Sequence, residues 1–409
     1  MTAVPGTWPT SRSRALDWLV HETTGEPFAD LVFGEVCRRL VEDGLAIDRA
    51  TFALRTLHPQ FLGGLFLWEP GYEEAAVNLY SHDAMRNQRY LESPVRAIFD
   101  GEVAGIRRRL DRPEEEGPNY PIYDDLREAG HVDYVMMAVP CVSGNINAAA
   151  FSTRRAGGFT TGELTTIADI LPVLGMAVEL RSNRRIAKNL LNAYVGSHAG
   201  ERILAGDIRR GSGETVRAAI WHCDMRGFTL LSESWPRDDV IGCLNAYFDA
   251  MASPVLEHGG DILKFLGDGM LAVFPLEEPR ACERALQAAL EARRAMRAIN
   301  EARREEQQPE IGFGIVLHAG DVMWGNIGAA TRLDFTVIGP AVNVASRLDG
   351  LTKELRRDIL LSGDFASLCE GARVRLVHVG AYRLRGVERE IDVFGLPEDF
   401  GSLPAPRPA

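Results

Sequence analysis

The chain has 409 residues, enough for two or three domains, and its 46% apolar and 25% charged residues are ordinary for a globular protein. Its formal net charge of -12 disfavours broad binding to nucleic acid, because the mean field would repel a polyanion. No apolar run approaches the roughly 20 residues of a membrane span, and residues 1–10 lack the basic and then apolar pattern of a signal peptide.

Residues 1–185 predict a small domain of mixed helices and strands. Leu16 to Val20 begins a helical pattern, which a second stretch from Phe28 to Leu40 continues. Ser93-Pro94 predicts the start of a short helix, since proline suits the first helical position. Two strand pairs follow from turn signals and apolar runs, at residues 50–57 with 61–68 and at residues 134–142 with 146–152. Pro113 to Pro121 predicts an exposed loop.

This order of helix, strands, short helices, strands and long helix resembles a GAF domain, a common small-molecule sensor module in signalling proteins. The resemblance implies an unknown small-molecule ligand for residues 1–185, with His82, His131 and Cys141 as candidate contacts. A different α+β dimerisation domain would explain the same order of elements.

A long helical stretch begins near Thr160 and continues past Arg184 towards Val195, with apolar residues three and four apart and Pro172 as a candidate kink. Such a helix is suited to pairing with its copy in a dimer. Residues 186–212 are predicted as a helical linker. They contain Tyr194-Val195-Gly196, Ile203-Leu204-Ala205-Gly206 and Arg209-Arg210-Gly211, and this pattern resembles the transducing element that precedes many bacterial cyclase domains. A glycine-rich linker without a signalling role is the alternative.

Residues 213–399 predict a second α+β domain, followed by a C-terminal tail at residues 400–409. Its expected elements run in chain order as strand (216–220), helix (238–257), hairpin (261–274), helix (279–305), strands (311–318 and 321–327), strand (335–338), helix (342–351) and three C-terminal strands (359–361, 380–384 and 391–396). Two helices that cross between paired strands give a βαββαβ core, which is a ferredoxin-like fold.

Two aspartates of this domain follow apolar, strand-like runs. Asp224 comes after the run that begins at Val216, and Asp268 occupies the turn after Ile262 to Leu266. Converging carboxylates of this kind can hold a pair of Mg²⁺ ions, which clamp the attacking and leaving oxygens of a phosphoryl displacement. The main-chain N–H groups of Gly227, Phe228 and Thr229 could cradle phosphates. Either aspartate alone would be an ordinary cap or turn residue.

Five sequence blocks in order set this domain apart: Asp224 to Thr229, Lys264 to Gly269, Gly312 to Gly320, Gly325 to Gly328 and Phe335 to Leu348. With these blocks, residues 213–399 resemble the catalytic domain of class III adenylyl and guanylyl cyclases. The resemblance implies attack of the ATP 3′-hydroxyl on the α-phosphorus, with release of pyrophosphate. It also implies a homodimer in which each active site takes its metal ligands from one chain and its purine-binding and transition-state residues from the other.

The resemblance assigns roles to residues. Asp224, Asp268 and Met225 match the metal-binding positions for two Mg²⁺ or Mn²⁺ ions. Asn343 and Arg347 match the transition-state residues that position the ribose and meet the α-phosphate. Lys264 and Thr336 match the purine-contacting pair. Two departures stand out: Asp321 replaces a basic residue of some members in the hairpin expected after Gly320, and Arg385 is the nearest basic residue to the family's second phosphate-binding lysine.

The purine pair favours adenine. Adenine offers an acceptor at N1 and a donor at N6; lysine only donates, whereas threonine can do either. Guanine reverses that edge, so a guanylate cyclase is the weaker alternative. A catalytically silent nucleotide-binding scaffold is another, and the intact set of Asp224, Asp268, Asn343 and Arg347 argues against it. The six cysteines form no Cys-x-x-Cys pair, which favours free thiols in a reducing cytosol and hence a cytoplasmic location.

Overall fold

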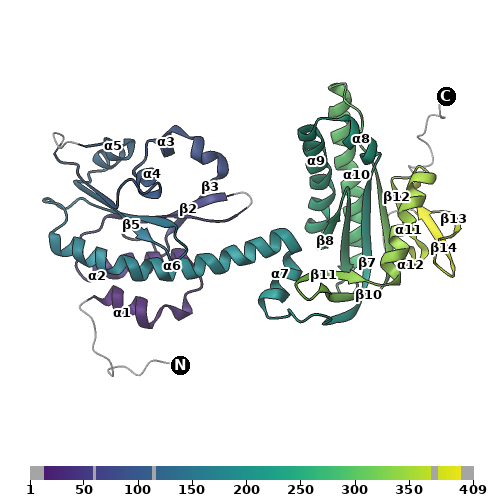
Figure 1. Cartoon of the computed structure of the whole chain (residues 1–409), viewed down its shortest axis with the longest axis horizontal. Helices are drawn as coiled ribbons and strands as arrows, with labels where there is room; N and C mark the ends of the chain where they lie inside the picture. Colours follow the sequence, from purple (N-terminus) through teal and green to yellow (C-terminus); the bar gives the residue numbers. More distant parts are fainter. Residues whose placement is uncertain (1–12, 59–60, 113–116, 370–375, 398–409) are drawn as a thin grey trace. The chain divides into compact units, whose positions relative to one another are not determined.

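The structure is a computed structural model that describes residues 13–58, 61–112, 117–369 and 376–397 (Figure 1). The chain divides into two compact units, Met1–Leu190 and Leu191–Ala409. The predicted tail at residues 400–409 and part of the predicted loop, residues 113–116, lie outside the described residues. Among the described helices, none is both long and apolar enough to cross a membrane.

The N-terminal unit is built on a six-stranded antiparallel sheet with the order β3-β2-β1-β6-β5-β4. Both predicted strand pairs are present, and Ser93 caps the predicted short helix by accepting a hydrogen bond from the N–H of Arg96. Strands β3 and β4 were not predicted from the sequence. The strands are β1 (Arg49–Arg55), β2 (Phe61–Trp68), β3 (Ala76–Ser81), β4 (Gly105–Arg109), β5 (Asp133–Pro140) and β6 (Ile146–Thr153).

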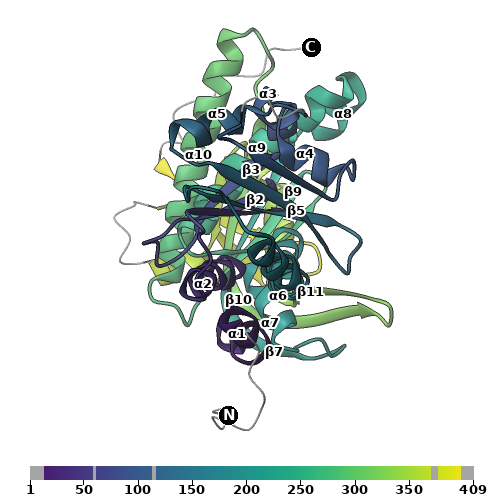
Figure 2. The same cartoon turned by 90° about the vertical axis from the view of Figure 1, so that its left-hand side faces the viewer.

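Helices cover both faces of this sheet (Figures 1 and 2). One face packs on α2 (Ala29–Glu42) and α6 (Thr161–Val195), with α1 (Arg14–His21) packed on α2 away from the sheet, and the other faces α3 (Gln88–Leu91), α4 (Pro94–Phe99) and α5 (Pro121–Glu128). Strand β1 shows how the sequence sets the two sides, because alternate side chains of a strand point to opposite faces. Phe52 lies in the core with α2, whereas Ala53 lies in the core on the other face.

The predicted long helix is α6, which a reciprocal cap starts. The Thr160 hydroxyl accepts from the N–H of Glu163 at 3.3 Å, and the Glu163 carboxylate accepts from the N–H of Thr160 at 2.8 Å. This arrangement satisfies donors that the first helical turn leaves free. The buried side of α6 is apolar from Ile167 to Val178, whereas no residue from Leu180 to Val195 is buried.

The sheet of the C-terminal unit has the order β13-β14-β12-β10-β7-β9-β8, with β11 paired to β10. The order β10-β7-β9-β8, with helices α9 and α10 between its strands in sequence, is the predicted βαββαβ arrangement. The strands are β7 (Gly213–Arg226), β8 (Asp261–Leu266), β9 (Gly269–Pro275), β10 (Gly312–Ala329), β11 (Arg332–Ile338), β12 (Ile359–Ser362), β13 (Val377–Arg383) and β14 (Glu390–Gly395). The main helices are α7 (Ser197–Leu204), α8 (Phe228–Ser234), α9 (Arg237–Glu257), α10 (Ala281–Glu305) and α11 (Pro340–Glu354).

Two apolar cores lie on opposite sides of this sheet. Trp221 and Cys223 of β7 face the core formed with α9 and α10, while Ala218 and Ile220 face the core formed with α11. Figure 1 shows α11 on the side of the sheet away from α9 and α10. The alternation continues along β7, so even-numbered residues near its end face α11.

Two predictions about strands β10 and β7 are wrong. The expected hairpin after His318 to Gly320 is absent, because β10 runs without a break from Gly312 to Ala329. Its Gly320 and Asp321 pair with Ala218 and Arg217 of β7, so the long ladder between β10 and β7 outweighs the local turn signal. Strand β7 extends beyond the predicted 216–220, which places Asp224 inside the strand rather than after it.

Candidate active site

Asp224 lies near the end of β7, between two glycines of the neighbouring strands. It is opposite Gly269 of β9 and Gly314 of β10, so no cross-strand side chain crowds its carboxylate. A Cβ on Gly269 would lie 3.4 Å from Asp224 Oδ1 and 2.9 Å from the Cys223 carbonyl oxygen. Glycine at this position therefore keeps both the strand spacing and the room around the carboxylate.

Asp268 reaches the same place from the β8–β9 turn. Its neighbour Gly267 adopts a left-handed conformation with φ of 68°, which glycine accepts without a steric penalty. Burial, and then the nearby Asp224 carboxylate, raise the pKa of Asp268 above its ordinary value. The structure thus brings together the two carboxylates that the sequence singled out. The side chain of Met225 points the other way, into the core with Cys223, so only its main-chain carbonyl is available to a metal.

A lysine that sequence analysis missed accompanies this carboxylate pair. Lys353 Nζ donates to Asp224 Oδ2 at 2.5 Å and lies 3.6 Å from Asp349 Oδ2. Although partial burial disfavours the ammonium, the hydrogen bond with Asp224 raises the pKa of Lys353. Two carboxylates held in contact repel each other, and the Lys353 ammonium offsets part of that repulsion from within the chain.

A buried polar cluster extends from this ion pair along β7 and α11. Burial lowers the pKa of His222 and raises the pKa of Asp349. The attraction between the two side chains when both are charged opposes each of these shifts. Among the described residues, His222 Nδ1 and Asp349 Oδ1 have no hydrogen-bond partner. The side of β7 that faces α11 is therefore apolar at Ala218 and Ile220 and polar at its Asp224 end.

Lys264 and Thr336 lie on β8 and β11, two strands that are close in space but not hydrogen-bonded to each other. Leu263 of β8 packs in the same core as Phe335 and Val337 of β11, which holds the two strands side by side. Lys264 is half-buried and Thr336 is 5% exposed. The Thr336 Oγ1 atom has no hydrogen-bond partner within the described chain. A buried hydroxyl in that condition has a free donor and acceptor for a ligand.

Asn343 and Arg347 share an exposed face of α11, as their four-residue spacing predicts. They do not reach the carboxylate pair of their own chain. Lys353 does reach that pair. It lies ten residues beyond Asn343 and six beyond Arg347, which at 1.5 Å per residue is about 15 Å and about 9 Å along the helix axis. It also lies roughly 80° and 120° around the helix from Asn343 and Arg347, at 3.6 residues per turn.

The candidate phosphate-binding positions lie on turns. Gly227 is left-handed, with φ of 75°, and joins β7 to α8. Phe228 packs against the core with α9 and α10, whereas Thr229 is exposed. Arg385 is exposed on the turn between β13 and β14. Neither turn contributes to the contact between Asp224 and Asp268.

Comparison with known proteins identifies the domain that holds these residues. Residues 212–397 match the family model described as the adenylate and guanylate cyclase catalytic domain. An adenylate cyclase of Anabaena cylindrica is 34% identical over 195 residues, which cover 46% of this chain and 38% of that protein. Adenylate cyclase 1 of Rhizobium meliloti strain 1021 is 32% identical over 198 residues, which cover 46% of this chain and 30% of that protein.

Among solved structures, the adenylyl cyclase CyaB from P. aeruginosa aligns with 26% identity and a TM-score of 0.42, covering 45% of this chain and 95% of that one. The chain spans less than two fifths of the length of the two curated relatives. Residues 212–397 of the C-terminal unit are therefore similar to a cyclase catalytic domain.

Proposed function

We propose that this cyclase catalytic domain converts ATP to 3′,5′-cyclic AMP and pyrophosphate. The observation that carries the proposal is the contact between the Asp224 and Asp268 carboxylates inside the matched domain. A pair of carboxylates in contact is a favourable place to bind a cation, and carboxylate oxygens are the protein ligands that Mg²⁺ and Mn²⁺ favour.

The two carboxylates fit a two-metal site. Asp224 and Asp268 would hold both ions, with the main-chain carbonyl of Met225 as a further ligand. When bound, such ions neutralise the triphosphate and favour ionisation of the 3′-hydroxyl. Glycines opposite Asp224 leave space for ligands. When the metal ions are not bound, Lys353 would neutralise part of the negative charge of the two carboxylates.

The remaining residues would orient the nucleotide. Phosphoryl transfer depends mainly on positioning and charge stabilisation. Asn343 would hold the ribose, and the planar guanidinium of Arg347 would bind the α-phosphate as charge builds up there. The N–H groups of Gly227, Phe228 and Thr229, together with the side chain of Arg385, would contact the outgoing phosphates.

The geometry favours a site shared between two chains. Within one chain, α11 carries Lys353 to Asp224 but holds Asn343 and Arg347 on another part of its surface. A second copy related by a two-fold axis would present its own Asn343 and Arg347 to that Asp224. A homodimer would then have two equivalent sites.

Lys264 and Thr336 would select ATP over GTP. A mismatched donor or acceptor edge leaves buried polar groups unpaired, which strongly disfavours the wrong base. We expect Lys264→Glu with Thr336→Cys to weaken ATP turnover and raise GTP turnover, measured as cyclic AMP and cyclic GMP formed. An unchanged ATP preference in the double variant would place purine selection elsewhere.

The direct test is turnover by the purified chain with ATP, or with GTP, in Mg²⁺ and in Mn²⁺. We expect cyclic AMP and pyrophosphate in equal amounts, and no product from Asp268→Asn. Asp249→Asn, which removes an exposed carboxylate from α9, is the matched control and should retain turnover. A folded wild-type chain that binds ATP without turnover would support the scaffold alternative instead.

A further inference from the structure

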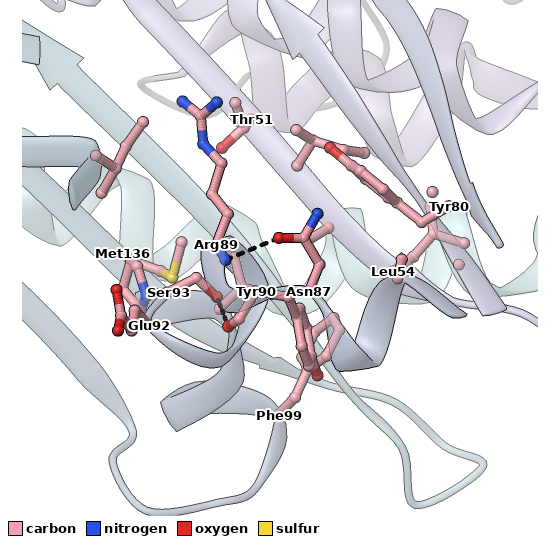
Figure 3. Close-up of a pocket in the computed structure, with 18 of the residues that line it drawn as sticks. Thr51, Leu54, Tyr80, Asn87, Arg89, Tyr90, Glu92, Ser93, Phe99 and Met136 are labelled. Atoms are coloured by element: carbon pink, nitrogen blue, oxygen red, sulfur yellow. Dashed lines mark hydrogen bonds between the residues drawn. The ribbon is translucent and has the colours of Figure 1, made fainter. Parts of the chain in front are cut away.

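The N-terminal unit contains a cavity of about 280 Å³ on the side of its sheet that faces α3 and α4 (Figure 3). This volume is close to the lower end of the range for small-molecule sites. The cavity lies wholly within the unit, between β1, β2 and β5 of the sheet and the short helices that follow β3. It is separate from every residue of the candidate active site.

Small residues form the floor of the cavity. Arg49, Thr51, Ala53 and Arg55 alternate along β1, so their side chains share the face that the cavity occupies. Gly63 of β2 lies opposite Arg55, and a Cβ there would lie 2.4 Å from the Leu54 carbonyl oxygen. Close pairing of β1 and β2 therefore requires glycine. Thr51, Ala53 and Gly63 therefore leave space above the middle of β1 and β2, although Leu65, Tyr134 and Met136 of the same sheet also line the cavity.

The walls are apolar and aromatic. Tyr80, Tyr90, Phe99 and Met136 lie around the space (Figure 3). Two polar groups of the helical wall are already occupied: Asn87 Oδ1 accepts from the N–H of Arg89 at 3.0 Å, and the Ser93 hydroxyl donates to the Tyr90 carbonyl at 2.7 Å. The wall thus offers a ligand mainly apolar contact.

Arginines line the edges of the cavity, and one of them, Arg89, is already paired with Asp125 at 2.6 Å. Arg49, Arg55 and Arg89 line the cavity, and Glu92 is the one acidic residue among its lining residues in the described chain. The guanidinium of Arg55 lies over the Phe99 ring at 4.8 Å and is 3.7 Å from Asp100, while Arg49 is 3.8 Å from Glu69. Both ion pairs are longer than an ordinary N–H···O hydrogen bond, so the two arginines at the ends of β1 retain donors for an anion.

We propose that this cavity binds a small amphipathic monoanion, with a flat apolar body over Thr51, Ala53 and Gly63 and a carboxylate or similar group against Arg49 or Arg55. The apolar body would replace the packing that the small floor residues leave out. A planar guanidinium suits a carboxylate or sulfonate. An uncharged molecule of the same shape would bury its body equally well but would lose the charged hydrogen bonds.

The test uses two fluorescent naphthalenes with the full-length chain. The anionic probe is 8-anilinonaphthalene-1-sulfonate, and the neutral one is N-phenyl-1-naphthylamine, which has the same rings without the sulfonate. We expect the anion to bind at least about tenfold more tightly, the size of a charged hydrogen bond. Equal affinities for the two probes would overturn the proposal.

Variants locate the bound probe. Val95→Trp fills the cavity from α4 and should remove most of the fluorescence of both probes. Circular dichroism checks that this variant is folded. If it is not, Ala53→Leu fills the cavity from the floor instead. Arg49→Met with Arg55→Met should abolish the preference for the anion while the neutral probe still binds. Arg14→Met with Arg38→Met removes the same charge from α1 and α2 and should change neither affinity. Unchanged anion binding in the Arg49/Arg55 variant, or in both filled variants, would place the probe elsewhere.

Discussion

At the residue scale, the ion pair between Lys353 and Asp224 sets a competition with divalent cations. The ammonium donates to the Asp224 carboxylate at 2.5 Å, and binding of a metal there must displace it. Lys353→Met removes this competitor, and we expect Mn²⁺ to bind about three- to tenfold more tightly, given that a partly exposed ion pair contributes about 1 kcal/mol. Electron paramagnetic resonance of free Mn²⁺, in a titration without nucleotide, measures the change.

The matched control is Lys353→Arg, which keeps the positive charge and should bind Mn²⁺ close to the wild-type affinity. Asp268→Asn should weaken Mn²⁺ binding, because it removes a proposed ligand. If Lys353→Met and the wild type bind Mn²⁺ equally, the ammonium does not compete for this site.

A second prediction concerns the pH dependence of stability at Asp268. Burial and the Asp224 carboxylate raise its pKa above the ordinary 3.8. An acid whose pKa is higher in the folded chain than in the unfolded chain is less easily ionised in the folded chain. Its contribution to the free energy of unfolding therefore falls as the pH rises above its pKa in the unfolded chain. In excess chelator, Asp268→Asn should therefore melt at a higher temperature than the wild type at pH 7. The gain should shrink as the pH falls toward 3.8. A gain that does not change with pH would contradict this origin.

At the scale of elements, periodicity and turn signals predicted the cores of the helices and strands but not all of their ends. The hairpin from β8 to β9 and the order of the βαββαβ core follow from local apolar runs. Strand β4 was missed because Gly105–Arg109 carries three arginines and little apolar signal. The continuity of β10 depends on pairing with β7, a long-range contact that a local turn signal does not reveal.

The same limit explains which site residues were found. Asp224 and Asp268 stand out because each follows an apolar run and has a glycine within three residues. Lys353 did not, because the predicted helix ended at Leu351 whereas α11 continues to Glu354. The Asp349 and Lys353 spacing of four residues was the available signal, and it becomes visible only once the helix is extended.

Strands β8 and β11 offer a test of the purine pair that separates binding from folding. Thr336 Oγ1 is buried without a partner in the described chain. Its replacement in Thr336→Val keeps the shape and removes the hydroxyl, so we expect the free energy of unfolding to rise by about 1 kcal/mol. The KM for ATP should rise as well, because the substrate loses a hydrogen bond.

Chemical denaturation and initial-rate kinetics measure the two effects on one preparation. Thr336→Ser retains the hydroxyl and should keep the wild-type KM for ATP. A loss of stability in Thr336→Val together with an unchanged KM would mean that the hydroxyl serves the fold rather than the nucleotide.

At the scale of the whole molecule, α6 makes the two units continuous in the chain, since Thr161–Val195 spans the division at Leu190. Its later part exposes Leu180 and Tyr194, at 71% and 79%. Apolar residues left exposed on a helix suit contact with a second copy. We therefore expect deletion of residues 1–185 to change cyclase activity, through the strength of dimerisation, by severalfold at low protein concentration.

The measurement is specific activity over a range of concentrations for the full-length and truncated chains, with sedimentation velocity to follow dimer formation. Leu180→Ser with Tyr194→Ser in the full-length chain should reproduce part of the effect without removing the N-terminal unit. Identical concentration dependence in all three proteins would show that residues 1–185 are not coupled to catalysis.

Assembly of the active site from two chains is the strongest test at this scale. Lys353 ties one region of α11 to Asp224, while Asn343 and Arg347 lie elsewhere on that helix. An Asp224→Ala chain would lack metal ligands but keep its transition-state residues, and an Asn343→Ala chain would have the opposite defect. Each homodimer should be nearly inactive.

A mixed dimer of these two variants would contain one doubly defective site and one site with every residue intact. Random exchange makes about half of the dimers mixed, and half of their sites are intact, so activity should recover to roughly a quarter of the wild-type value. Two affinity tags, purified in sequence, isolate the mixed dimers and should raise the recovered activity to about half. Asp224→Ala mixed with Asp268→Ala is the matched control: both defects lie in the metal ligands, so every site in the mixed dimer is impaired and no recovery is expected. Tagged mixed dimers of the first pair that form and remain inactive would mean that each chain completes its site alone, by a movement of α11 that brings Asn343 and Arg347 to its own carboxylates.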